Sequence, residues 1–178
     1  MKISSSIIVL LALLFCGCKA IDELTHFDVE YNYTFTLPSY GGINLDNLDI
    51  KTNDLENSNE STFENNNTKK HLVESATLKK FNVEIIDPID ADFSFLDKVE
   101  IFVSTETLEE KMIAWQDHIA QNVGDYLELE TTSSNLRKYL ISDEIRVRLK
   151  TTSSEPLMND LLLDLQSKVE VDAKILGI

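Results

Sequence analysis

The segment from residue 26 to residue 37 alternates apolar and polar side chains without a break. Its apolar members are Phe27, Val29, Tyr31, Tyr33, Phe35 and Leu37. Because successive side chains of a strand point to opposite faces, this strict period of two predicts a long strand with one buried and one solvated face. A Pro38-Ser39-Tyr40-Gly41-Gly42 stretch follows, and its turn-forming residues predict that the strand ends there.

The same alternation returns in the second half of the chain. It covers residues 72–85, 95–104, 111–115, 127–130, 145–149 and 161–175. A change of phase at Lys79-Lys80 indicates a β-bulge in the first of these segments. The last segment keeps one phase across Ser167, so it is interpreted as a single long strand. Residues 135–141 instead have a helical spacing after Ser133-Ser134, which predicts one short helix capped by serine.

Residues 43–70 lack such a pattern, and the part from 56 to 70 is rich in Asn, Ser and Glu. This composition predicts a polar loop over 56–70 rather than a site. Short alternating strands separated by turn signals, with few helices, are typical of an all-β fold. We therefore predict an antiparallel β-sandwich, immunoglobulin-like or jelly-roll-like, with seven to nine strands and one short helix, over residues 26–178.

The N-terminus has the layout of an export signal. Lys2 supplies one positive charge, and the nine residues from Ile7 to Phe15 are all apolar. Small residues follow, which completes the three-part pattern of a secretory signal. The apolar run is shorter than the ~20 residues that a membrane-spanning helix needs. We therefore expect residues 1–17 to be a signal peptide.

The segment Phe15-Cys16-Gly17-Cys18 resembles the lipobox of bacterial lipoproteins. That resemblance implies cleavage before Cys18, acyl chains on the Cys18 sulfur, and residues 18–25 as a lipidated tether. Phe15 departs from the leucine that is usual three residues before the cysteine. Cys16 is a rival acceptor, with Leu13 at that position, but cleavage there would require Phe15 where a small residue is expected.

The resemblance also implies a location. A lipid-anchored protein of this kind belongs to the bacterial cell envelope, and we expect it at the outer membrane. The short acidic stretch after Lys19 is similar to a surface-export signal of Bacteroidetes lipoproteins, so the periplasmic and the surface face both stay open. Residues 72–178 resemble, in general pattern, small Bacteroidetes β-sandwich lipoproteins of unassigned function.

Charge and cysteine content narrow the function further. The chain has 31 acidic and 16 basic residues, and removal of residues 1–17 leaves a net charge of −16. So acidic a chain argues against nucleic-acid binding and against a polybasic contact with membranes, since both need basic patches. Both cysteines, Cys16 and Cys18, lie in the signal region, so the sandwich is expected to contain no disulfide.

Acidic residues cluster at Asp87, Asp90 and Asp92, with Asp97 shortly after them. Calcium takes six to eight oxygen ligands, and a turn that carries three carboxylates can supply several. Aspartate is also a frequent turn former because its side chain bonds the nearby backbone. The cluster is therefore a calcium candidate and, more simply, a turn; no other cofactor is expected.

Histidines and aromatic residues give weaker signals. The three histidines are His26, His71 and His118, and none lies in a metal-ligand spacing. Three aromatic residues are candidates for a carbohydrate platform, with the sandwich core as the alternative: Tyr40, Trp115 and Tyr126. No nucleophile elbow or glycine-rich phosphate loop occurs.

These observations favour a non-enzymatic function. We expect a lipid-anchored binding or structural module of the cell envelope that contacts an envelope protein or a glycan. The alternative is a hydrolase of envelope or extracellular polymers that uses two convergent carboxylates with perturbed pKa values. A sandwich alone does not decide between them, because this architecture hosts many functions.

Overall fold

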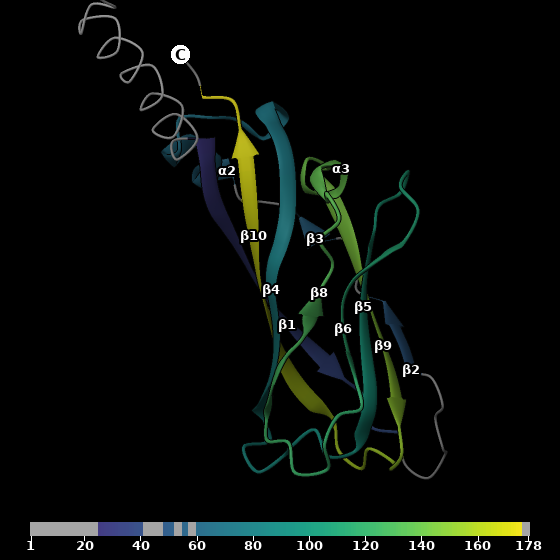
Figure 1. The fold of residues 1–178 in the computed structure, drawn as a ribbon. Coiled ribbons are helices and arrows are strands. Elements are labelled where there is room, and N and C mark those ends of the chain that lie inside the picture. Colours follow the sequence, from purple (N-terminus) through teal and green to yellow (C-terminus); the bar gives the residue numbers. More distant parts are fainter. Residues whose placement is uncertain (1–24, 41–47, 52–54, 57–59, 176–178) are drawn as a thin grey trace, which may run out of the picture.

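The structure, a computed structural model, describes residues 25–40, 48–51, 55–56 and 60–175 (Figure 1). These residues form eight strands of three or more residues and two strands of two residues. The strands are β1 (His26–Leu37), β2 (Leu48–Lys51), β3 (Leu55–Glu56), β4 (Val73–Asp87), β5 (Leu96–Ser104), β6 (Lys111–Asp117), β7 (Tyr126–Glu128), β8 (Glu130–Thr131), β9 (Glu144–Ser153) and β10 (Leu161–Ala173). Helices α2 (Glu60–Asn65) and α3 (Arg137–Leu140) and the 3-10 turn η1 (Lys70–Leu72) are short.

The strands form two antiparallel sheets. The first has the order β1-β10-β4-β7, and the second has the order β2-β9-β5-β6-β8, with β3 also paired to β9. Along the chain, most consecutive strands alternate between the two sheets, and the first and last strands are neighbours. Two antiparallel sheets whose strands are connected in this way make a jelly roll. The prediction of an all-β antiparallel sandwich is confirmed, and of its two variants the jelly-roll-like one is correct.

β1 and β10 are the strands whose patterns were clearest in the sequence. They pair over twelve residue positions, from His26 opposite Asp172 to Leu37 opposite Leu161, without a register shift. β10 is continuous through Ser167, as its single phase predicted. Every second side chain of β10 points inward, and leucine, valine and alanine fill almost all of these positions.

The phase change in β4 is a bulge, as predicted. Leu78 pairs with Val169 and Lys80 pairs with Lys168, so Lys79 has no partner residue on β10. Lys79 and Lys80 are both exposed, whereas Leu78 and Phe81 on either side of them are buried. The bulge therefore absorbs one extra residue and keeps the apolar side chains of both halves on the inner face.

The sequence predicts one strand over residues 127–130, whereas residues 126–131 form two short strands that connect the two sheets (Figure 1). β7 pairs with β4 of the first sheet, and β8 pairs with β6 of the second. Between them, buried Leu129 donates its N–H to the carbonyl oxygen of Phe81 at 2.9 Å. One long side of the sandwich is thereby closed by a strand that changes sheets.

The polar loop expected over 56–70 is a point on which the structure differs from the prediction. Residues 60–65 form α2, and its Phe63 is buried with its ring edge-on to Phe27 at 5.7 Å between centroids. Thr68 is also buried, and its hydroxyl donates to the carbonyl oxygen of Lys174 at 2.5 Å. A polar segment is thus fixed to the sandwich by a single aromatic side chain and by backbone contacts.

The second helix lies where it was expected, but its cap differs. Asn135 Oδ1 accepts hydrogen bonds from the N–H of Arg137 at 2.9 Å and from the N–H of Ala76 at 3.2 Å. The serines at 133 and 134 were expected to cap the helix, whereas this asparagine satisfies its first turn and joins it to β4. Asn135 is therefore both a helix-start residue and a link between elements.

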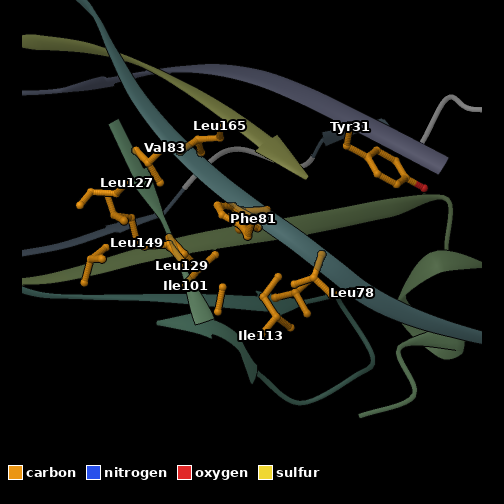
Figure 2. Packing of buried hydrophobic residues seen from close by; sticks show 14 of the residues in the cluster. Tyr31, Leu78, Phe81, Val83, Ile101, Ile113, Leu127, Leu129, Leu149 and Leu165 are labelled. Atoms are coloured by element: carbon orange, nitrogen blue, oxygen red, sulfur yellow. The ribbon is translucent and has the colours of Figure 1, made fainter. Parts of the chain in front are cut away.

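The core lies between the two sheets. Figure 2 shows inward side chains of β4, such as Phe81 and Val83, facing the second sheet, with Ile101 of β5 opposite them. Leu129, on the segment that changes sheets, belongs to the same buried cluster. These side chains are buried. Burial of aliphatic and aromatic surface from both sheets is the main stabilising contribution of such a sandwich.

The two ends of the sandwich differ (Figure 1). At the helical end, defined by α2, η1 and α3, β1 begins and β10 ends. At the loop end, defined by residues 88–95, 118–125 and 154–160, the connections bond one another: Phe93 N–H donates to Gly124 at 3.1 Å, and Ser153 Oγ donates to Phe95 at 2.7 Å. Phe93 is almost fully buried there, so the loop end is tightly packed.

Candidate functional site

A cavity of about 120 Å³ lies between the two sheets on the side of the helical end. Its lining comes from the inner faces of both sheets and from the α3 region. The lining residues are Tyr31, Tyr33, Thr34, Phe35, Leu78, Phe81, Val103, Ile113, Leu136, Tyr139, Leu140, Ile145, Val147, Leu165, Ser167 and Val169. These described residues include no charged side chain, so the cavity is a strongly apolar site.

One wall is formed by the edge strand β1. The rings of Tyr31 and Tyr33 are stacked, with 6.3 Å between centroids and 18° between planes. Tyr31 is buried, whereas Tyr33 and Phe35 are half-buried. Burial raises the pKa of the Tyr33 phenol above its ordinary value, because the charged form loses its hydration. At ordinary pH this wall is therefore neutral.

The opposite wall comes from the second sheet and α3. Val103, Ile113 and Val147 are buried, whereas Tyr139 and Ile145 are half-buried. The Tyr139 hydroxyl donates to the carbonyl oxygen of Glu109 at 2.8 Å, which fixes the direction of its ring. We define the mouth of the cavity by its half-buried apolar lining residues, Tyr33, Phe35, Tyr139 and Ile145.

Ser167 is the exception in the inward row of β10. The other inward positions are Leu161, Leu163, Leu165, Val169, Val171 and Ala173, all of them apolar and buried. Ser167 lines the cavity, opposite Tyr31 on β1 and Phe81 on β4. A short side chain at this position leaves room that leucine or valine fills elsewhere in the row.

The volume of about 120 Å³ and the apolar lining suit a small apolar molecule. Cavities lined by apolar groups stay free of water and bind small apolar molecules. A ligand of that chemistry would bury the apolar lining of the cavity.

The calcium candidates lie at the loop end, away from the cavity. Asp87 ends β4, while Asp90 and Asp92 belong to the turn that follows. The Ser94 side chain and the Ser94 N–H, which lies 2.9 Å from Asp92 Oδ1, both donate hydrogen bonds that hold the pKa of Asp92 below its ordinary value. Among the described residues, no three His, Cys, Asp or Glu side chains come together in a way that could hold a metal ion.

The histidines and the proposed aromatic platform are dispersed. His26 lies at the start of β1, His71 in η1 and His118 after β6. Tyr126 is exposed on β7 of the first sheet, and Trp115 is half-buried on β6 of the second. Tyr40 packs against the core and donates its backbone N–H to Leu157 at 2.9 Å. The three aromatic residues therefore do not share one strand or one sheet face.

The outer face of the second sheet carries paired charges. Lys98 contacts Glu100 at 3.1 Å and Asp117 at 3.0 Å, and Lys150 lies 3.5 Å from Glu100. Nearby, Arg148 binds Glu110 through two guanidinium nitrogens and stacks over the Phe102 ring. The lysine partners lie at the surface, whereas Glu100 and Arg148 are mostly covered, with 16% and 14% of their side chains exposed.

Cys18, Cys16 and the rest of the signal region lie outside the described residues. No helix in the described part of the chain is long and apolar enough to cross a membrane. The prediction of lipidation at Cys18 therefore stays a prediction at this point.

No protein-family model matches the chain, and no curated protein is significantly similar to it. Solved structures with a similar course of the backbone include the infectious bursal disease virus VP2 subviral particle, at 7% identity and a TM-score of 0.31. The match covers 83% of this chain and 32% of the VP2 chain, so this chain spans about a third of that protein's length.

Two plant-virus structures are similar at the same distant level. Desmodium yellow mottle tymovirus matches at 13% identity and a TM-score of 0.27, over 86% of this chain and 85% of that chain. The empty head of turnip yellow mosaic virus matches at 8% identity and a TM-score of 0.26, over 85% and 83%. These likenesses are too distant to bear on function, and the jelly-roll assignment rests on the strand order.

Proposed function

We propose that this protein is a lipid-anchored binding module of the bacterial cell envelope, and that it binds an apolar molecule between its two sheets. The apolar cavity is the observation that carries the binding part of this proposal. The lipobox-like segment that ends at Cys18 supports the anchor.

The cavity favours an apolar ligand over the other partner classes that the sequence suggested. A glycan needs hydroxyl-binding polar groups, and an envelope protein needs a broad surface with a packed centre. The described cavity lining has neither a carboxylate nor a basic side chain. The hydrolase alternative consequently has no observation in its favour at this site.

Apolar binding is tested on the chain from residue 18 to residue 178 with Cys18→Ser, made without the signal. This chain contains every described core residue, from Val29 to Ala173. We expect saturating benzene to raise its melting temperature, because a ligand that binds only the folded state stabilises it. An unchanged melting temperature would count against a binding function for the cavity.

The anchor is tested separately, by mass spectrometry of the mature N-terminus from cells and by membrane fractionation. We expect a terminus at Cys18 that carries acyl chains, and loss of the protein from the membrane fraction for Cys18→Ala. Cys16→Ala is the matched control and should remain membrane-bound. If the Cys16→Ala protein leaves the membrane fraction and the Cys18→Ala protein stays in it, the acylated residue is Cys16.

A further inference from the structure

We propose that the occupant of the cavity is the end of an unbranched hydrocarbon chain from a membrane lipid. This inference rests on the proposed function, because it names the ligand of the same cavity. It is carried by the volume and the lining of the cavity and by its place in the fold. The hydrocarbon chain would enter at the mouth of the cavity, between β1 and the α3–β9 side of the sandwich.

The volume limits how much of a lipid can enter. Cavities of roughly 150 Å³ accept benzene, which has six carbons. By that scale, about 120 Å³ takes roughly five carbons. The cavity is therefore large enough for the end of one hydrocarbon chain.

Ser167 lies between the other two β10 residues of the lining, Leu165 and Val169. A larger side chain at this position would extend into the space between the two sheets. Ser167 is therefore the residue whose substitution tests whether the cavity is the binding site.

The lining matches the two parts of such a ligand. The inner residues, such as Leu165 and Val147, offer only hydrocarbon surface, which suits a chain end without polar groups. At the mouth, the half-buried rings of Tyr33 and Tyr139 have hydroxyl groups. Tyrosine is favoured where one side is apolar and the other is wet, as at the point where a lipid chain leaves the protein.

The position in the fold indicates the source of the chain. Eight residue steps separate Cys18 from His26, and they reach at most about 29 Å when fully extended. Tyr31 is five residues further along β1, or about 17 Å. A tether at Cys18 thus keeps the cavity within roughly 46 Å of the bilayer, where acyl chains are the most abundant apolar groups.

The first experiment measures binding of straight-chain alkanols, from propanol to octanol, to the Cys18→Ser chain by calorimetry. We expect the Kd to fall about fourfold for each added methylene, as for other buried CH₂ groups, and to level off beyond roughly five carbons. Benzene that raises the melting temperature, together with alkanol affinities that do not depend on length, would overturn the chain proposal and leave the proposed function intact.

The binding site of the ligand is tested by substitutions that fill the cavity with a larger side chain. Ser167→Leu should weaken pentanol binding at least tenfold, and Ser167→Val, a smaller change that is safer for folding, should weaken it by a lesser factor. Gln166→Leu is the matched control, since it puts the same side chain on the outer face of the same strand. If both Ser167 variants bind pentanol as tightly as the parent, the ligand does not occupy this cavity.

Whether the ligand comes from a membrane lipid is tested with an acyl chain in two forms, one in a bilayer and one free in solution. The first arm uses phosphatidylglycerol vesicles whose lipid carries a fluorophore near the end of one acyl chain. Addition of the Cys18→Ser protein should change the fluorescence emission, and the additional substitution Ser167→Leu should abolish this change. Free dodecanoate is the second arm. Binding of dodecanoate without any response to the vesicles would overturn a membrane lipid as the source.

Discussion

One phenylalanine connects the polar segment before β4 to the sandwich. Phe63 is 2% exposed and packs edge-on against Phe27. We predict that Phe63→Ala lowers the free energy of unfolding by about 3–5 kcal/mol, because it removes a buried aromatic ring and leaves a cavity. Urea-induced unfolding followed by circular dichroism measures this loss.

Phe102 provides the matched control for that substitution. It is half-buried on the outer face of the second sheet, with the guanidinium of Arg148 4.1 Å from its ring centroid. Phe102→Ala should cost only about 1 kcal/mol, since little buried surface and one cation–π contact are lost. Equal losses for the two substitutions would mean that α2 is not fixed by Phe63.

Tyr33 makes stability sensitive to alkaline pH. Its pKa is raised by burial, so the folded state holds the phenol proton more tightly than the unfolded state. Stability is then fully present below the ordinary tyrosine pKa of about 10 and declines as pH rises through the higher folded value. Tyr33→Phe should reduce this decline without abolishing it, because burial also raises the pKa of Tyr40. Melting temperatures from pH 9 to pH 11.5 test this, and identical declines for both proteins would refute it.

At the scale of single elements, the bulge in β4 leads to a prediction about deletions. Lys79 has no partner on β10, and its neighbours already pair one to one with that strand. Deletion of Lys79 should therefore keep the register and both faces of β4. The deletion also removes a half-exposed ion pair between Lys79 and Glu170, and we expect the free energy of unfolding to fall by about 1 kcal/mol.

Deletion of Asn82 is the contrasting case. Asn82 pairs with Gln166 in the regular part of β4, between inward-facing Phe81 and Val83. Its removal would turn the inward side chains on one side of the deletion toward solvent. We expect loss of the cooperative thermal transition for this variant and its retention for the Lys79 deletion. The opposite result would show that the bulge is required for folding.

Elements with a pattern of their own were predictable from the sequence. The unbroken alternation of β1 and β10, the phase change at Lys79-Lys80 and the short helix near residue 137 all have local signals. α2 was missed because Phe63 stands alone among polar residues, and one apolar side chain defines no period. The short strands β2 and β3 depend on pairing with β9, which is a non-local interaction that no local pattern reveals.

The candidate site was largely hidden from the sequence for a similar reason. A cavity arises from how two sheets pack, and the alternation of each strand only says which side chains face inward. The available signal was Ser167, the one polar residue in an otherwise apolar row. The alternation of β10 predicts that Ser167 faces inward. A short side chain at that position is also compatible with a fully packed core, so it does not by itself indicate a cavity. The acidic cluster near Asp90, which the sequence makes a calcium candidate, lies in a turn.

At the scale of the whole molecule, folding depends on the last strand. β10 lies between β1 and β4 and pairs with both along most of its length. A chain that ends at residue 160 should therefore show no cooperative unfolding, because the central strand of the first sheet is missing. Thermal melting of residues 18–160 tests this. A synthetic peptide of residues 161–178 should restore the transition, and a cooperative transition without it would contradict the prediction.

The pairing of β1 with β10 also has a mechanical consequence. If the chain is held at Cys18 while a load acts on the loop end, the force enters at the first residue of β1 and runs along that strand. The twelve paired positions between β1 and β10 are then strained in shear, all together rather than one after another. Such an arrangement resists detachment far better than a strand that is peeled from its end. Under such a load, the pairing between β1 and β10 is the part of the domain that carries the force.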